Sequence, residues 1–172
     1  MAAIEPVLIA LFIAHLVATL VGAGSIVLAE WRYFRAIVDG RIDAGERAHL
    51  VTLFFSLRFA LIAVLIINIL FGIVFLIVPH PLAPSLVTMY WFEMFIIFTL
   101  LIVSWLRFHG RIPFWAGSSF AFVGWWYLVG VDLGLVPTAS FTADLLGFFL
   151  SVFVVALLFG YVRFLVAHSA RA

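Results

Sequence analysis

The chain has 172 residues, of which 67% are hydrophobic and only 10% are charged, and its mean hydropathy is +1.34. A soluble domain is about half apolar and about a quarter charged, so this composition excludes both a water-soluble globule and a disordered chain. A net charge of +1 without any Lys argues against extended nucleic-acid binding, and the lack of Cys excludes disulfides and thiolate metal sites. We therefore predict one all-α integral membrane domain over residues 1–172, with the lipid bilayer as its first partner.

Five stretches are long and apolar enough to cross a bilayer, because a helix needs about 20 apolar residues to do so. In chain order they cover residues 6–29, 50–78, 84–106, 113–135 and 140–166. Pro113 stands where the first turn of a helix tolerates proline. Ser140 or Thr142 is placed to cap the fifth helix, with Asp144 in its first turn. The pattern predicts a bundle of five transmembrane helices.

Arginine lies only on alternate sides of these spans, and this distribution predicts an orientation. The groups are Arg32, Arg35, Arg41 and Arg47 after the first span, Arg107 and Arg111 after the third, and Arg163 and Arg171 near the C-terminus. By the positive-inside rule the N-terminus lies outside and the C-terminus in the cytoplasm, and we expect a bacterial cytoplasmic (inner) membrane. The polar segment 31–49 is expected to be a solvated hairpin or short surface helix, or else a docking surface for anionic headgroups or a partner.

Polar groups inside the spans are the best candidates for function, because an ionisable group there costs a few kcal/mol unless it is paired or faces a cavity. At about 1.5 Å per residue, His15 lies about 13 Å below the outer end of its span. Glu93, Asn68, Trp125 and Trp126 fall near the same level. We therefore expect these five side chains to converge in one layer, although His15 and Glu93 also suit hydrogen-bonded packing roles.

The neighbours of His15 predict which way it faces. Ala18, Thr19 and Gly22 share its helical face, and small residues at that spacing permit close helix contact, so His15 is expected to point into the bundle. Arg58 lies within the second span near its cytoplasmic end. It is expected either to extend its long stem toward the interface or to form an ion pair with Glu30.

Two short patterns stand out in the first and third spans. The first span joins a deep His to small residues and a basic end (His15, Gly22, Gly24, Arg32), and the third opens with Trp91 and closes with Arg-Phe-His-Gly at 107–110. Over the first three spans the chain loosely resembles the HemJ/CopD-type small membrane proteins. HemJ is a protoporphyrinogen oxidase thought to bind haem b, and CopD-type proteins are linked to copper handling.

The resemblance implies that His15 occupies a haem-ligand position. The chain departs from HemJ in two ways: the Lys of the third span is absent, with Phe95 near its place, and the aromatic pair that follows the His is missing. What the resemblance implies is therefore the architecture of a haem pocket and not protoporphyrinogen oxidation.

Three functions follow as hypotheses. The first is a small membrane redox protein that binds a b-type haem within the helix bundle, with His15 as the axial metal ligand and Glu93 and Asn68 as candidate catalytic groups that orient the ligand or handle protons. Trp125 or Trp126 would lie against the ring, and Arg58 would complete the cofactor-binding set.

The second hypothesis is a protein that transports protons, ions or small solutes along a path of His15, Glu93 and Arg58. The third is a non-catalytic subunit of a larger membrane complex, in which buried polar groups serve only packing. The short chain without large loops is expected to form a homo-oligomer or to join such a complex.

Overall fold

The computed structural model describes residues 5–38, 44–77, 88–136 and 140–169. In these ranges all regular structure is helical: α1 (Glu5–Val38), α2 (Ala44–Ile77), α3 (Thr88–Phe108), α4 (Phe114–Asp132) and α5 (Phe141–Ser169). Each of the five helices is long and apolar enough to cross a membrane. The predicted all-α class and the five predicted spans are thus confirmed at this level.

The first two helices continue beyond the predicted spans into segment 31–49. Much of segment 31–49 is not a separate hairpin, because α1 continues to Val38 and α2 already begins at Ala44. Aromatic packing explains the longer α1: the ring of Tyr33 stacks on Phe114 at the start of α4, with centroids 4.1 Å apart. Residues 39–43, like residues 78 and 84–87 of the predicted spans, lie outside the described residues.

The ends of α4 and α5 follow local rules. α5 is capped by Ser140, whose hydroxyl accepts a hydrogen bond from the backbone N–H of Ala143 at 3.2 Å, so Ser140 and not Thr142 is the cap. Pro113 lies just before the first residue of α4, in extended conformation. α4 ends at Asp132 instead of 135, because Gly134 adopts a positive φ of 66° that closes the helix.

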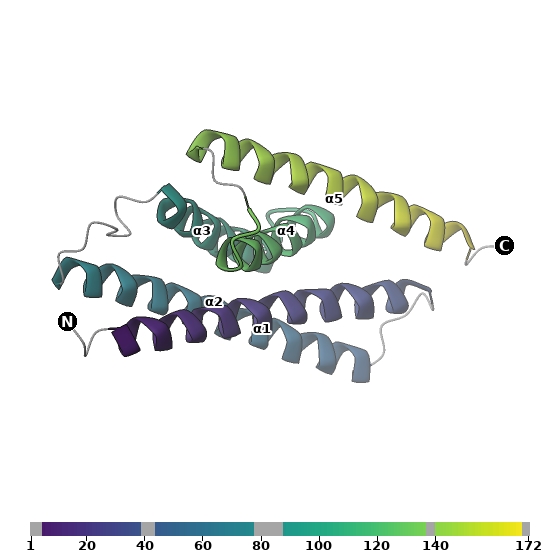
Figure 1. Ribbon diagram of the computed structural model, residues 1–172. Coiled ribbons are helices and arrows are strands. Elements are labelled where there is room, and N and C mark those ends of the chain that lie inside the picture. Colours follow the sequence, from purple (N-terminus) through teal and green to yellow (C-terminus); the bar gives the residue numbers. More distant parts are fainter. Residues whose placement is uncertain (1–4, 39–43, 78–87, 137–139, 170–172) are drawn as a thin grey trace.

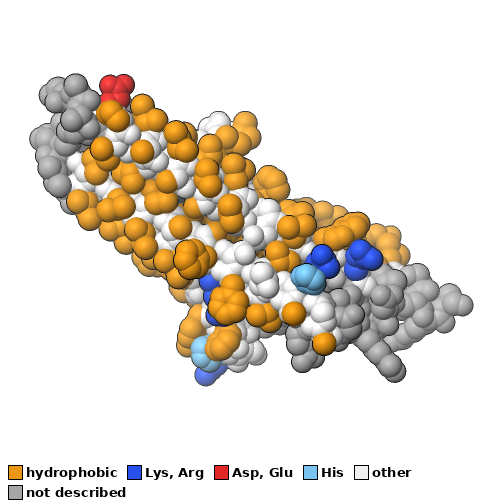
Figure 2. Space-filling model, turned by 90° about the horizontal axis from the view of Figure 1, so that it is seen from below, with side chains coloured by type: hydrophobic (Ala, Val, Ile, Leu, Met, Phe, Trp, Pro, Cys, Tyr) orange, Lys and Arg blue, Asp and Glu red, His pale blue; other side chains and the backbone are white. Residues whose placement is uncertain are grey.

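The helices pack in layers (Figure 1): α1 and α2 form one side, α3 and α4 lie in the middle, and α5 covers the opposite side. α4 is the most buried helix and α5 the least. The surface seen in Figure 2 is largely hydrophobic. The basic and His side chains in view lie toward one end of the molecule, and the acidic side chain in view lies toward the other. We call the end where α1, α3 and α5 begin the N-terminal end, and the opposite end, which carries Arg35, Arg107 and Arg111, the arginine-rich end.

Candidate functional site

A buried hydrogen-bonded set joins α1, α2 and α4 in the half of the bundle toward the N-terminal end. His15 Nδ1 lies 2.8 Å from Asp132 Oδ1, and His15 Nε2 lies 3.0 Å from Asn68 Nδ2. The Thr19 hydroxyl donates to Asp132 Oδ2 at 2.6 Å. We call these four residues the histidine cluster.

The partners of the imidazole fix its hydrogen-bonding roles. An amide NH₂ can only donate, so Nε2 of His15 accepts from Asn68 when Asn68 is oriented as in the structure. The ring proton then lies on Nδ1 and points at the carboxylate of Asp132. Both nitrogens of His15 are thus engaged, one by a titratable group and one by an amide.

The cluster is almost closed to the surroundings. His15 is 3% exposed, Asn68 is 2% exposed and Thr19 is fully buried. Glu93 of α3 lies partly buried beside the Asn68 side chain, within electrostatic range of both His15 and Asp132. Four helices therefore bring an imidazole, an amide and two carboxyl groups together. The depths estimated from the sequence had placed three of these residues, His15, Asn68 and Glu93, at the same level.

Sequence reasoning missed Asp132 and the role of Thr19. Asp132 lay inside the predicted fourth span and was not counted as a candidate, whereas it is the last residue of α4 and its side chain turns back into the bundle. Thr19 was counted only as a small residue on the face of His15. A usable signal was present: Asp132 lies three residues inside the predicted outer end of the fourth span, about one to two helical turns from the predicted level of His15.

The two tryptophans expected in this layer separate. Trp126 is 46% exposed and does not belong to the cluster. Trp125 is buried, but about two turns of helix deeper: a Cβ at Gly22 would lie 2.1 Å from its ring, so the indole fits against the bare backbone of α1. Trp125 therefore lies between the histidine cluster and the other half of the bundle.

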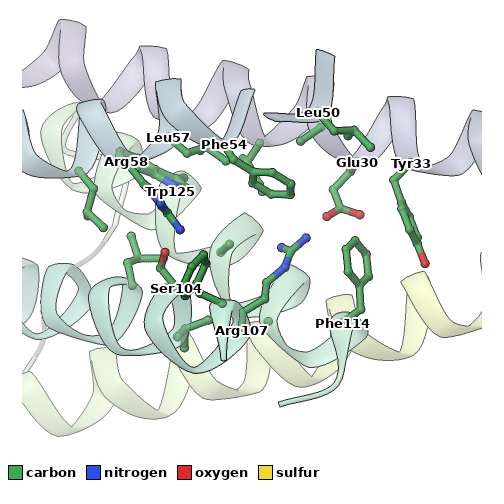
Figure 3. A pocket seen from close by; sticks show the side chains of 18 residues that line it. Glu30, Tyr33, Leu50, Phe54, Leu57, Arg58, Ser104, Arg107, Phe114 and Trp125 are labelled. Atoms are coloured by element: carbon green, nitrogen blue, oxygen red, sulfur yellow. The ribbon is translucent and has the colours of Figure 1, made fainter. Parts of the chain in front are cut away.

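Beyond Trp125 the bundle encloses a pocket of about 430 Å³ among α1, α2, α3 and α4. Trp125 lines one end, Tyr33 and Phe114 line the other, and Arg58 and Arg107 reach in from α2 and α3 (Figure 3). We call this the arginine pocket. His15 and Asn68 do not line it.

The expected ion pair between Arg58 and Glu30 was wrong. The Glu30 carboxylate accepts a hydrogen bond from Ser118 and lies 3.5 Å from Nη2 of Arg163, on α5. Arg58 instead has its guanidinium over the ring of Phe108, 5.2 Å from the centroid. Arg163 lies close to the start of α4 and can therefore reach Glu30, although the two residues are far apart along the chain.

The geometry does not suit a haem held by His15. The nitrogens of His15 are both hydrogen-bonded, and Trp125 and Arg58, expected at the same cofactor, line a pocket that His15 does not reach. Among the described residues no group of three or more His, Cys, Asp or Glu side chains could hold a metal ion. Haem binding and metal ligation by His15 stay predictions.

Comparison of the chain with protein-family models, with curated proteins and with solved structures finds no match. The resemblance to HemJ/CopD-type proteins therefore also stays a prediction.

Proposed function

We propose that the protein moves protons across the membrane and that the histidine cluster, together with Glu93, carries them. The observation that supports this proposal most directly is the contact between titratable groups: Asp132 bonds His15, and Glu93 lies within electrostatic range of both. Ionisable groups inside a membrane are expensive, and chains of Asp, Glu and His side chains are the usual proton relays of pumps and transporters.

The imidazole of His15 connects two directions. Its Nδ1 proton points at Asp132, at the end of α4, while its Nε2 lone pair points at Asn68, beside which Glu93 lies. When Asn68 swings off Nε2, a proton can bind there as the Nδ1 proton passes to Asp132, and the ring then returns to its first tautomer. One proton enters and one leaves, so the charge of the imidazole is unchanged after each cycle.

Orientation gives the relay a direction. With the arginine-rich end in the cytoplasm, as the positive-inside rule predicts, Asp132 lies toward the outer side and the arginine pocket lies toward the inner side. In a bacterial inner membrane the outer side is the periplasm. The layer formed by Trp125 on Gly22 separates the two polar regions, and its displacement is the step that we expect to control proton passage.

A rival interpretation gives these groups a packing role alone, as in a non-catalytic subunit of a larger complex. The two interpretations differ in what the proton itself must do. Asp132→Asn tests this difference, because the amide oxygen still accepts from Nδ1 of His15 and the NH₂ group can donate to the Thr19 hydroxyl, which also lies 2.9 Å from the carbonyl of Leu16. The variant keeps the geometry and removes the titration.

The experiment uses purified protein in liposomes with a trapped pH-sensitive dye, an imposed pH difference, and potassium with valinomycin to hold the membrane potential. The wild type is expected to dissipate the pH difference faster than protein-free liposomes. Asp132→Asn and His15→Gln are each expected to slow this by about tenfold or more, because one link of the relay no longer exchanges protons.

The matched control is Asp144→Asn, which removes a buried carboxylate at the N-terminal end but on α5, where no described contact joins it to His15. This control is expected to conduct like the wild type. Wild-type protein no faster than empty liposomes, or Asp132→Asn as fast as the wild type, would overturn the proposal. In the second case, the cluster serves helix packing.

A further inference from the structure

We propose that the arginine pocket binds an amphipathic anion from the bilayer, a molecule with a phosphate or carboxylate head on a hydrocarbon body. This site lies on the other side of Trp125 from the histidine cluster, and the inference does not depend on proton transport. A pocket of about 430 Å³ lies within the range of ordinary ligand sites.

Charge is the first argument. Three guanidinium groups surround this region, those of Arg58, Arg107 and Arg163, whereas Glu30 is the one carboxylate among the residues that line the pocket. Glu30 is already engaged by Ser118 and by Arg163. Glu30 also lies within electrostatic range of Arg107, so one described carboxylate faces three guanidinium groups. Two positive charges remain in excess, and a bound anion would neutralise them.

The way the two guanidinium groups are held is the second argument. Arg107 lies over the rings of Phe54 and Phe114, at 4.9 and 4.2 Å from their centroids, and Arg58 lies over Phe108 at 5.2 Å. An aromatic ring interacts with a cation through its face and supplies no hydrogen-bond acceptor of ordinary strength. In the described part of the chain no oxygen accepts a hydrogen bond from either guanidinium, so their N–H edges are available to an anion.

The remaining lining fits a hydrocarbon body. Between the charged groups the walls are aliphatic, with Leu57 and Leu61 from α2 and Leu100 and Val103 from α3. A bare phosphate would leave this apolar space unfilled, whereas an amphiphile places its chain there.

The position of the pocket explains how such a ligand would enter. Arg58 and Phe108 both line the pocket and are both exposed on the outside of their helices, α2 and α3. α2 and α3 also pack on each other much less than α2 packs on α1. The opening therefore lies between two membrane-spanning helices, where acyl chains meet the protein.

Native mass spectrometry of the detergent-purified protein tests this inference, with phosphatidic acid and oleate as anionic probes, phosphatidylcholine as the probe without net charge, and inorganic phosphate as the head alone. We expect at least one anionic amphiphile to bind about tenfold or more tightly than phosphatidylcholine, and inorganic phosphate not to bind. Preference for phosphatidic acid identifies a phosphate head, and preference for oleate a carboxylate head.

Variants decide whether the bound amphiphile is in the pocket. Arg58→Gln and Arg107→Gln are each expected to weaken binding about tenfold, since each removes a charge-assisted hydrogen bond. Arg111→Gln is the matched control, because Arg111 is an exposed arginine at the same end that does not line the pocket. Ala121→Phe keeps every arginine but fills the pocket from α4, and it should abolish binding.

Three results would overturn the inference: no anionic amphiphile preferred over phosphatidylcholine, equal losses in Arg111→Gln and Arg58→Gln, or undiminished binding in Ala121→Phe. Arg58 is exposed, so Arg58→Gln keeps the test valid if Arg107→Gln fails to fold. A negative result here leaves the proton-flux experiment unaffected, because its variants lie on the other side of Trp125.

Discussion

The two polar regions of the bundle differ in how completely their hydrogen bonds are formed. In the histidine cluster, both nitrogens of His15 and both carboxylate oxygens of Asp132 have partners within 3.0 Å. In the arginine pocket, Arg58 and Arg107 contact mainly aromatic faces, and Oε2 of Glu30 makes no described hydrogen bond. The chain itself supplies the hydrogen-bond partners of the histidine cluster, whereas the arginine pocket has hydrogen-bond donors and positive charge that the described residues do not satisfy.

This difference separates two uses of buried polarity. A saturated set of titratable groups can pass a proton without taking in any other molecule, whereas an unsaturated set beside a cavity suits a ligand that completes it. The comparison therefore predicts that substitutions act differently in the two regions, both on folding stability and on function.

The largest effect is expected from Glu30→Gln. Among the described residues, the variant removes the one carboxylate near three arginines and leaves Arg163, mostly buried, without a described counter-charge. Loss of one partner from a buried ion pair costs about 3 kcal/mol of unfolding free energy, measurable by denaturation in mixed micelles with SDS. The same variant should bind an anionic amphiphile more tightly, because a competing negative charge is gone.

Glu93→Gln is the comparison for Glu30→Gln, because Glu93 has no described arginine partner. We expect it to lower the unfolding free energy by well under half as much as Glu30→Gln does. Equal losses of stability in the two variants would mean that the arginine-rich region is no more dependent on its carboxylate than the histidine cluster. The double variant Glu30→Gln/Arg163→Gln should recover part of the loss, since it also removes the unpaired cation.

The boundary between the regions gives the second prediction. In Gly22→Ala the new methyl group would lie 2.1 Å from the ring of Trp125, so the indole or α1 must move, at a cost of about 3 kcal/mol of unfolding free energy. Gly24→Ala has open space at the same helix and should be neutral or slightly stabilising. Thermal unfolding in detergent compares the two, and similar midpoints would show that Trp125 does not pack against α1.

A third prediction concerns the saturation of the histidine cluster. Asp132→Ala leaves the Nδ1 proton of His15 without its acceptor and should lower the unfolding free energy by about 2 kcal/mol. Asp132→Asn keeps both hydrogen bonds and should cost less than half of that. Denaturation curves that coincide for the two variants would indicate that the cluster contributes little to stability.

The five-helix fold and part of the histidine cluster could be predicted from the sequence. Apolar stretches of sufficient length report five helices because the bilayer sets their length, and the 3.6-residue period places His15, Thr19 and Gly22 on one buried face. Depth along each span also brought His15 and Asn68 to the same level, and the structure joins them by a hydrogen bond.

The partners across the bundle were not predictable in the same way. Depth constrains the level of a residue but not the azimuth of its helix. One of the two expectations for Arg58 therefore paired it with Glu30, whereas the structure pairs Glu30 with Arg163. The helix end at Asp132 was missed because hydropathy marks a span only to within about a turn. Trp126, one position from Trp125, shows the same limit: a neighbouring residue faces about 100° away and lies on the outside.

The smallest effect is expected from Thr19→Val, and it tests whether the cluster needs every bond. Thr19 donates to Asp132, but it also lies within hydrogen-bond distance of the carbonyl of Leu16 in its own helix. Thr52→Val is a matched control, because the exposed Thr52 bonds only a carbonyl of its own helix, that of Ala48 at 3.1 Å.

The difference between the two variants isolates the bond to Asp132, and we expect about 0.6 kcal/mol, the usual value for a side-chain hydrogen bond between membrane helices. Proton flux in Thr19→Val should stay close to the wild type, because Asp132 keeps its contact with His15. A flux as low as that of Asp132→Asn would instead mean that Thr19 holds the carboxylate in the only orientation from which it can receive the proton of His15.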